Sequence, residues 1–499
     1  MADNLFTRFV QAAPDLNRNF IFPPGRTPLS YCDAFAAAAR FARVLARHGV
    51  TPGDRVAVQV EKSPEALFVY LACLRLGAIY LPLNSDYTAN ELAYFASDAE
   101  PQIFICPERA REKIAGFFPN DRILTLNDDG TGTLVREASQ EESQFSDAPM
   151  AMNDLAAILY TSGTTGRSKG AMLSHGNLFS NASSLKQAWR YSQEDVLLHA
   201  LPIFHTHGLF VATNTTLLSS ASMIFLPKFN LDAMFAALPV ATVMMGVPTF
   251  YTRLLSDPRL NKDSTRNMRL FISGSAPLLA ETHQQWQQRT GHHILERYGM
   301  TETNMNTSNP YDGKRMPGSV GHPLPGVDLR LTDQDGNPTQ GEVGMIEVRG
   351  PNVFSGYWRM PEKTAAAFRA DGFFVTGDLG TIDADGYLHI VGRENDMIIT
   401  GGFNVYPKEV ESLIDSLPGV EESAVVGLPH KDFGEGVTAI IVPRAGADLA
   451  EDAIMAALNG QLAKFKLPKR VIIVRELPRN TMGKVQKSLM RTKYAGLYD

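Results

Sequence analysis

The chain has 499 residues, 44% of them hydrophobic, and its 47 basic and 53 acidic side chains leave a formal net charge of -6. This length exceeds the size at which one hydrophobic core keeps growing, so we expect at least two domains. A weak negative charge gives no general attraction to nucleic acid or anionic lipid, so we expect neither nucleic acid nor a membrane as a partner.

Cysteine use favours a cytoplasmic location. Cys32, Cys73 and Cys106 are odd in number and far apart, so they support neither a disulfide framework nor a thiolate zinc site. The first residues lack the basic and apolar segments of a signal peptide. The apolar run at residues 240–251 is interrupted by Gly246 and Pro248 and is too short to cross a membrane.

Strand and helix signals alternate along the N-terminal part, which predicts parallel α/β layers. Capping boxes at Ser30 with Asp33 and at Thr88 with Glu91 each begin a helix. Another helix begins at Pro64 and ends at Gly77, whose backbone tolerates a left-handed conformation. Strands are predicted at residues 56–60, 102–106, 241–246 and 268–273.

The pattern changes from about Leu331 onward. Residues 335–338 and 383–386 are typical hairpin turns, so a β-rich subdomain is expected there. A last α/β unit has strand candidates at residues 424–426 and 471–474. We place a domain boundary near Arg393, which divides the chain into residues 1–394 and residues 395–499.

A loop rich in glycine and hydroxyl groups follows the predicted buried strand at residues 156–160. It spans residues 161–170, TSGTTGRSKG, and can offer many hydrogen-bond donors to phosphate oxygens. It is not a Walker A loop, because Ser168-Lys169-Gly170 stands where that motif needs Gly-Lys followed by Ser or Thr. An ordinary P-loop ATPase is therefore disfavoured.

The loop resembles that of the adenylate-forming superfamily, which contains acyl-CoA synthetases, carrier-protein adenylation domains and beetle luciferases. Four further blocks occur in the order found in that superfamily: YGMTE at residues 298–302, TGD at 376–378, GR at 392–393 and PRNTMGK at 478–484. The resemblance implies an α/β fold with a large N-terminal domain of parallel α/β sheets plus a β-rich subdomain. It also implies a small, mobile α+β C-terminal domain.

The resemblance assigns ATP and Mg²⁺ to specific residues. The loop would hold the β- and γ-phosphates, Tyr298 would flank the adenine, Thr301 would contact the α-phosphate, and Glu302 would hold Mg²⁺. Asp378 and Arg393 would bind the ribose, and Lys484 would bridge the attacking carboxylate and the α-phosphate. The loop residues assigned in this way are Thr161, Ser162, Gly163, Thr164, Thr165, Gly166 and Lys169.

CoA is the expected second co-substrate. In the superfamily the C-terminal domain rotates between adenylation and thioester formation, about a pivot that is usually Asp or Lys and is Asn395 here. Gly401 and Gly402 match the segment beside the thiol channel. Lys464, Lys466, Lys469 and Arg470 form a basic cluster that could meet CoA phosphates or simply be solvated. Acylation of Lys484 by a regulatory enzyme would abolish its charge.

The acid is predicted from Arg297, which precedes Tyr298-Gly299 where relatives with bulky acids commonly have glycine. A buried guanidinium needs an anionic partner, and a second carboxylate on the substrate offers a bidentate match. Because Arg is also bulky, the acid should be short, and malonate is the natural candidate. The set of Arg297, His207, Ser275 and Met305 resembles malonyl-CoA synthetases in particular.

Several alternatives remain open at this level. Arg297 could form a structural ion pair with Glu296, and His205 with His207 could be a metal pair. Methylmalonate, oxalate or succinate could replace malonate, because one methylene changes selectivity by only about 1 to 3 kcal/mol. The acyl group could pass to a carrier protein instead of CoA. A nucleotide-regulated binding protein without turnover is the alternative from another class.

Overall fold

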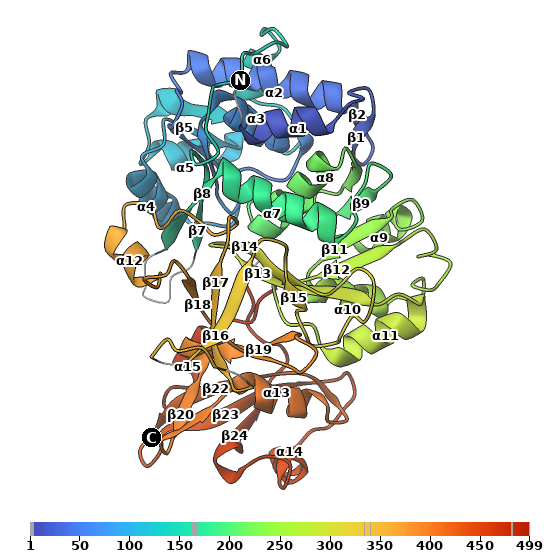
Figure 1. Cartoon of the computed structure of the whole chain (residues 1–499), viewed down its shortest axis with the longest axis vertical. Coiled ribbons are helices and arrows are strands. Elements are labelled where there is room, and N and C mark those ends of the chain that lie inside the picture. The colour runs from blue at the N-terminus through green and yellow to red at the C-terminus, as the bar shows by residue number, and fades with distance from the viewer. Residues whose placement is uncertain (1–3, 162–167, 334, 340, 481–482, 499) are drawn as a thin grey trace.

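A computed structural model describes residues 4–161, 168–333, 335–339, 341–480 and 483–498. The protein is a mixed α/β protein with a large N-terminal domain and a small C-terminal domain (Figure 1). Within these ranges the strands form four sheets. No helix of the described residues is long and apolar enough to cross a lipid bilayer.

Two sheets with parallel centres form the N-terminal layers. The first has the order β6, β5, β3, β4, β7, β8, and only β8 runs antiparallel to its neighbour. Its strands are β3 Arg55–Val58, β4 Ile79–Pro82, β5 Ile103–Cys106, β6 Ile123–Thr125, β7 Leu155–Thr161 and β8 Lys169–Ser174.

The second and largest sheet has the order β15, β14, β13, β12, β11, β9, β10, β1, β2. Its strands from β13 to β1 are parallel, and the strands at both edges are antiparallel. They are β1 Asn19–Phe22, β2 Leu29–Ser30, β9 Val196–His199, β10 Ser222–Phe225, β11 Val243–Gly246, β12 Leu270–Ser273, β13 Ile294–Met300, β14 Asn304–Ser308 and β15 His322–Pro323.

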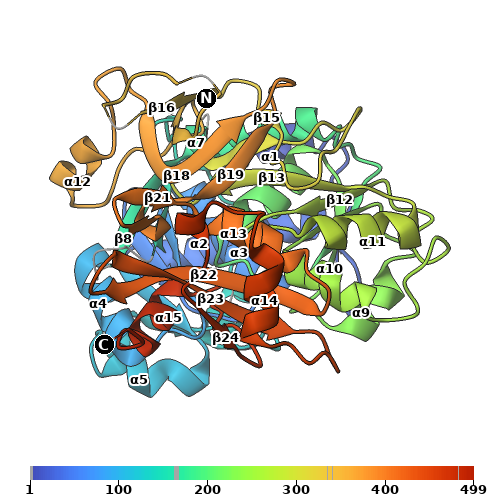
Figure 2. The ribbon, with the colours of Figure 1, turned by 90° about the horizontal axis from the view of Figure 1, so that it is seen from below.

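Two smaller sheets follow in the chain. An antiparallel sheet has β16 Asp328–Thr332, β17 Gly344–Arg349, β18 Phe374–Ile382 and β19 Leu388–Arg393 in sequence order. The C-terminal sheet joins β20 Ile398–Thr400, β21 Phe403–Val405, β22 Val420–His430, β23 Gly434–Pro443 and β24 Arg470–Ile473. Seen from below, this last sheet lies in front of the N-terminal layers (Figure 2).

Helices cover the sheets. The α-helices are α1 Leu5–Ala12, α2 Tyr31–Arg47, α3 Pro64–Leu76, α4 Ala89–Ala99, α5 Arg111–Ala115, α6 Thr133–Ala138, α7 His175–Ala188, α8 Asn214–Leu218, α9 Leu231–Ala237, α10 Pro248–Leu255, α11 Ala280–Thr290, α12 Pro361–Ala366, α13 Pro407–Asp415, α14 Glu451–Leu458 and α15 Lys487–Lys493. Short 3₁₀ turns are η1 Glu108–Ala110, η2 Asn120–Arg122, η4 Glu394–Asp396 and η5 Lys464–Lys466, and η3 His207–Thr213 is a π-helix.

Local signals place the helix ends correctly. Both predicted capping boxes are present, because Ser30 caps α2 and Thr88 caps α4 through reciprocal hydrogen bonds. Helix α3 is buried along its whole length and ends at Gly77, which has φ +73°. The strands predicted at residues 56–60, 102–106, 241–246 and 268–273 exist but are shorter than expected, since β3 ends at Val58 and β12 begins only at Leu270. The strand predicted at residues 424–426 is part of the longer β22.

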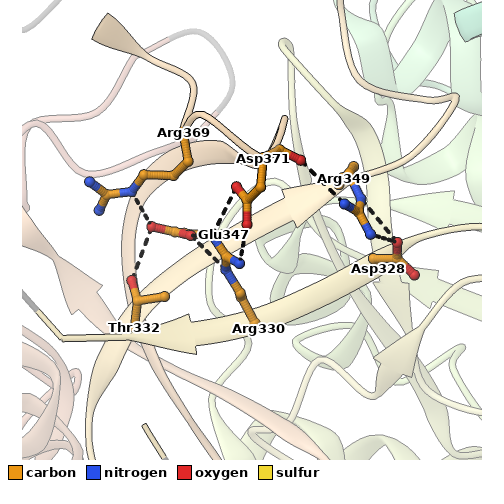
Figure 3. Close-up of polar contacts among 7 residues, drawn as sticks. All are labelled: Asp328, Arg330, Thr332, Glu347, Arg349, Arg369 and Asp371. Atoms are coloured by element: carbon orange, nitrogen blue, oxygen red, sulfur yellow. Dashed lines mark hydrogen bonds and ion pairs between the residues drawn. The ribbon is translucent and has the colours of Figure 1, made fainter. Parts of the chain in front are cut away.

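A polar cluster stabilises the antiparallel sheet that follows the N-terminal layers (Figure 3). The fully buried Glu347 accepts hydrogen bonds from Arg330 at 2.8 Å, Arg369 at 2.6 Å and the Thr332 hydroxyl at 3.0 Å. Arg330 also pairs with Asp371 at 2.5 Å. Three donors therefore compensate the buried carboxylate, and they join β16 and β17 to the turn before β18.

Candidate active site

The predicted acid-pocket residues come together at the carboxyl ends of the parallel strands β9, β12 and β13. Arg297 lies on β13, Ser275 follows the end of β12, and His207 begins η3 after β9. Ligands in open α/β sheets bind at this edge. The π-helical turn at His207 is a rare geometry that often marks functional positions.

Arg297 is a buried cation without an acidic partner. It is 4% exposed, and no ion pair joins it to any described carboxylate. Its Nε and Nη2 atoms, which lie on one edge of the guanidinium, are buried and have no hydrogen-bond partner among the described residues. Burial lowers the pKa of Arg297 to about 9. Glu296 is turned elsewhere and accepts a hydrogen bond from the Gly318 N–H at 3.0 Å, so the Arg297–Glu296 alternative is not what the structure has.

His207 presents a second free donor to the same pocket. Its Nδ1 lies 3.2 Å from the Ser275 hydroxyl, and its buried Nε2 has no hydrogen-bond partner within the part of the chain that the structure describes. Burial, and then the charge of Arg297, lower the pKa of His207 far below its usual value. A neutral His207 that accepts from Ser275 through Nδ1 carries its proton on Nε2. Ser275 reaches this position with φ +72°, an uncommon backbone for a residue other than glycine.

Met305 lies beside Gly299 in the adjacent antiparallel strand β14. A Cβ on Gly299 would stand 2.6 Å from the Met305 methyl carbon, so the methionine fills that space. The Asn181 amide on α7 donates to the Met305 carbonyl at 2.8 Å and accepts from its N–H at 3.3 Å. The Met305 backbone is therefore fixed from the helix side.

A buried lysine lies behind the pocket. The Lys62 ammonium contacts His199 Nδ1 at 2.9 Å and the His199 carbonyl at 2.8 Å, and it lies over the Phe225 ring. His199 Nε2 in turn contacts the Gly208 carbonyl at 2.9 Å, next to His207. Sequence reasoning missed both residues and Asn181, because nothing local in the chain connects them to the pocket.

The predicted ribose ligands are also brought together. Asp378 on β18 and Arg393 on β19 are directly paired in the strand register, and Arg393 Nε lies 3.0 Å from Asp378 Oδ1. The Tyr298 hydroxyl donates to the other Asp378 oxygen at 2.6 Å. The charge of Asp378 raises the pKa of Arg393. The Asp378 carboxylate thus holds both Tyr298 and Arg393, and these are the three residues predicted to face the nucleoside.

Glu302 lies nearby in the turn after β13. It is 6% exposed and accepts a hydrogen bond from the Tyr357 hydroxyl at 3.0 Å, while the Lys169 ammonium lies over the Tyr357 ring. Burial raises the pKa of Glu302, and the charges of Lys169 and Arg393 oppose that rise. Thr301 precedes Glu302 directly. A carboxylate oxygen here suits Mg²⁺, which takes one or two protein carboxylates together with phosphates and water.

The phosphate loop lies largely outside the described residues. Thr161 ends β7 and Lys169 begins the antiparallel partner β8, with the Thr161 hydroxyl 3.4 Å from the Lys169 carbonyl. The predictions for Ser162, Gly163, Thr164, Thr165 and Gly166 concern residues that the structure does not describe. The two strands fix both ends of the loop beside Glu302 and Tyr357.

Lys484 comes from the C-terminal domain, and its neighbour Gly483 lies beside Thr249 of the N-terminal domain, where an added Cβ would stand 3.4 Å from the Thr249 hydroxyl. Burial, and then the charge of Arg393, lower the pKa of Lys484, while Asp378, Asp396 and Glu302 raise it. Its own charge contributes, after burial and Arg297, to lowering the pKa of His205 to about 4. The ammonium is therefore electrostatically coupled both to the nucleotide-facing carboxylates and to the acid pocket.

The predicted hinge and CoA-channel residues of the C-terminal domain lie on the surface. Asn395 is exposed within η4, and Gly401 with Gly402 forms the turn between β20 and β21 with φ of +57° and +80°. In the predicted basic cluster, Lys466 pairs with Glu409, Arg470 pairs with Glu451, and Lys469 lies over the Phe433 ring. No three His, Cys, Asp or Glu side chains among the described residues are grouped to hold a metal.

The chain belongs to the AMP-binding enzyme family. The family model described as AMP-binding enzyme matches residues 6–358, and that of the AMP-binding enzyme C-terminal domain matches residues 409–484. The family comprises enzymes, and the residues built into the site above lie within these matches or between them.

Relatives and solved structures extend this result. The chain is 35% identical over 478 residues to a malonate–CoA ligase from Arabidopsis thaliana, covering 89% of this chain and 78% of the relative. It is 35% identical over 480 residues to a feruloyl-CoA synthase from an Amycolatopsis species, covering 94% of this chain and 95% of the relative. Relatives at equal identity therefore carry names with very different acids.

The chain is more similar to a solved structure. ATP-bound MatB from Rhodopseudomonas palustris is 58% identical, with full coverage of both chains and a TM-score of 0.98. The structure of the same protein without ligand gives a TM-score of 0.87. The present arrangement, with Lys484 inside the site, is thus closer to that of the ATP-bound protein.

Proposed function

We propose that the protein is a malonate–CoA ligase that converts malonate, ATP and CoA to malonyl-CoA, AMP and pyrophosphate through malonyl-adenylate. The observation that carries the acid is the unpartnered edge of Arg297. Nε and Nη2 present two parallel N–H groups, which is the geometry that a carboxylate fills with two hydrogen bonds. A monocarboxylic acid would leave this buried charge without a partner.

The carboxylate of malonate that Arg297 does not bind is the one that reacts. With its far end held by Arg297 and the His207 Nε2 proton, a three-carbon acid directs its near end toward Lys484 and Thr301. Met305 and the Arg297 side chain bound the pocket and leave room for a short chain. The names of the malonate–CoA ligase relatives and the identity to MatB support the same acid.

The ATP end uses the residues around Asp378. Asp378 and Arg393 would bind the ribose with Tyr298 beside the adenine, and the strands ending at Thr161 and beginning at Lys169 would hold the loop against the β- and γ-phosphates. Glu302 would hold Mg²⁺, which neutralises phosphate charge when bound. Thr301 would contact the α-phosphate.

Two displacements complete the reaction. A malonate oxygen attacks the α-phosphorus and pyrophosphate leaves, so both negative groups must be neutralised where they meet. The Lys484 ammonium, which feels charges at both ends of the site, would bridge the carboxylate and the α-phosphate. The CoA sulfur then attacks the acyl carbon, AMP leaves, and the thiol proton passes to solvent. Pivoting at Asn395 would withdraw Lys484 and bring Gly401 and Gly402 beside the thiol.

The acid panel tests this proposal directly. AMP release is measured with CoA across C2 to C6 mono- and dicarboxylates, including methylmalonate, oxalate and succinate. Malonate should give the highest kcat/KM, and acetate should be poor. Equal turnover of acetate and malonate would reject the dicarboxylate pocket. Replacing CoA with a holo-carrier protein separates a ligase from a carrier-loading module, and absence of AMP with every acid would reject turnover altogether.

Substitution of Arg297 tests the carrying observation. Arg297→Ala should lose about 2 to 5 kcal/mol in kcat/KM for malonate, the usual cost of orphaning one partner of a buried charge pair. Acetate turnover should fall much less, because acetate has no second carboxylate. Equal losses for both acids would show that Arg297 supports the fold rather than the substrate.

A regulatory role at Lys484 stays a proposal of the same kind. A lysine-acylating enzyme that modified Lys484 would remove the charge used for adenylation. The cytoplasmic location expected from the cysteine content is likewise a prediction.

A further inference from the structure

Gly274 lies against the side chain of Arg297, which binds malonate in the proposed function. Strands β12 and β13 are parallel neighbours, with Ser273 paired to Glu296 at the end of their register. The next residues along the two strands are therefore Gly274 and Arg297. A Cβ added to Gly274 would stand 2.4 Å from Arg297 Cζ and 2.6 Å from its Nε and Nη1.

These separations show which side of the guanidinium meets the glycine. A Cβ that approached one of the N–H edges in the plane would lie nearer to a nitrogen than to the central carbon. Here Cζ is the nearest of the three atoms, so the missing Cβ would stand over the guanidinium face. The face rests on the bare backbone at Gly274, and the buried Nε and Nη2 edge has no hydrogen-bond partner among the described residues.

The glycine is not explained by its backbone conformation. Gly274 is absent from the residues with positive φ, so an L-residue could adopt its backbone without strain. The following residue shows the reverse, because Ser275 carries a side chain at φ +72° and uses it to contact His207. The Arg297 guanidinium occupies the space that a side chain at position 274 would need, so this position requires a glycine.

Arg297 has no simple way to move aside. It is 4% exposed, so solvent offers no alternative site for the charge. The backbone of Gly274 is also fixed, because its N–H donates to the Gly246 carbonyl at the end of β11. A side chain at position 274 would push the guanidinium out of the orientation that presents two parallel N–H groups.

We propose that Gly274 is a specificity-determining residue that holds the Arg297 guanidinium in the orientation that selects a dicarboxylic acid. The proposal rests on the proposed function, since the dicarboxylate is the ligand of that edge. Gly274 makes no hydrogen bond to the acid through a side chain. It acts as a positioning residue, and the smallest possible addition, one methyl group, should disturb the selection.

Kinetics of Gly274→Ala test the proposal. The kcat/KM for malonate should fall about a hundredfold or more, while that for acetate changes by about threefold or less, so the ratio between the acids collapses. The matched control is Gly246→Ala at the end of the neighbouring strand, where a Cβ would meet Phe250 at 3.1 Å rather than Arg297. The control should keep the malonate preference, and a Gly274→Ala enzyme that also keeps it would overturn the proposal.

A double-mutant cycle separates a clash with Arg297 from general damage. In an Arg297→Ala background the added methyl group has room, so Gly274→Ala should change malonate kcat/KM by about threefold or less. An equal loss in both backgrounds would overturn the proposal. If Gly274→Ala alone does not fold, the double variant should fold with the thermal midpoint of Arg297→Ala, and failure to do so would also overturn it.

The same cycle distinguishes the two levels of inference. If Arg297→Ala keeps the malonate preference, the proposed dicarboxylate pocket fails. If Arg297→Ala loses the preference and Gly274→Ala keeps it, only the role of Gly274 fails.

Discussion

The Lys484 ammonium is electrostatically coupled to both ends of the site, the nucleotide-facing carboxylates and the acid pocket. Lys484 is held in a loop of the C-terminal domain, where its own N–H donates to the Asn480 side-chain oxygen at 2.9 Å. Burial lowers its pKa and repulsion from Arg393 lowers it further, while Asp378, Asp396 and Glu302 raise it. Two negative substrate groups would relieve that repulsion, so the residue is suited to the moment when carboxylate and phosphate meet.

Lys484→Ala should slow adenylation by about a hundredfold, which corresponds to roughly 3 kcal/mol of transition-state stabilisation. Malonate-dependent exchange of pyrophosphate into ATP measures this step without CoA. The control is Lys493→Ala. Lys493 is the last residue of α15 and lies over the Tyr494 ring, so its replacement should leave exchange unchanged. An unimpaired Lys484→Ala enzyme would contradict the bridging role.

His175 predicts a pH dependence of stability. It is fully buried, its Nδ1 accepts from the Leu5 N–H at 3.2 Å, and burial lowers its pKa to about 4. The unfolded chain, with a histidine pKa near 6.5, binds the proton more readily as pH falls from about 6.5 to 4. The folded state therefore loses stability across this window.

His175→Asn keeps an acceptor for the Leu5 N–H but cannot be protonated. Between pH 7 and pH 4.5 the variant should lose roughly 2.5 kcal/mol less stability than the parent chain. Urea unfolding of both proteins at the two pH values gives the difference, in which the other titrating groups largely cancel. Parallel losses in both proteins would show that His175 takes up its proton in the folded state.

At the scale of elements, α7 and β14 are joined by one amide. The Asn181 side chain donates to the Met305 carbonyl and accepts from the Met305 N–H, as the backbone of a neighbouring strand would. The position of Met305 thus depends on a helix that lies outside the sheet carrying the site. Packing between these elements should consequently influence both stability and acid choice.

Asn181→Leu should destabilise the fold by about 1 to 3 kcal/mol, because the buried Met305 N–H loses its acceptor and the Met305 carbonyl is left with the Asn352 amide at 3.4 Å. The preference for malonate over methylmalonate should also decrease as Met305 shifts. Urea unfolding and the ratio of kcat/KM for the two acids measure these effects. Ser180→Ala is the control, since the Ser180 hydroxyl donates to the Asn177 carbonyl on the same helix. Unchanged stability would contradict the clamp.

Elements were predictable where their signals are local. Each capping box, at Ser30 and at Thr88, depends on residues within one turn of each other, and both are confirmed. The helix from Pro64 to Gly77 has a local signal at each end and is also confirmed. Sheet order was not predictable in this way, since β9, β10 and β11 are neighbours through pairings that no short window contains. The contact of Gly274 with Arg297 depends on such a register, so sequence reasoning identified the arginine but missed the glycine.

At the scale of the whole molecule, motif order carried more information than composition. Glu302, Asp378, Arg393 and Lys484 belong to separate sequence blocks, yet Asp378 raises the pKa of Arg393, and Arg393 in turn lowers that of Lys484 and opposes the rise in that of Glu302. No spacing argument gives that convergence. The resemblance supplied it, and the geometry gives it a physical form. The boundary at residue 395 stays a prediction.

Asn395→Pro tests that boundary and the pivot together. Proline fixes φ near −65°, so a residue that must change its backbone angles between two half-reactions would be locked. The present arrangement already places Lys484 in the site, so pyrophosphate exchange should stay within about threefold of the parent enzyme. Formation of malonyl-CoA from preformed malonyl-adenylate should fall about a hundredfold, because the domain would no longer turn. Asn395→Ala, which leaves the backbone free, should retain both steps. Loss of both steps in the proline variant, or of neither, would contradict a pivot at this residue.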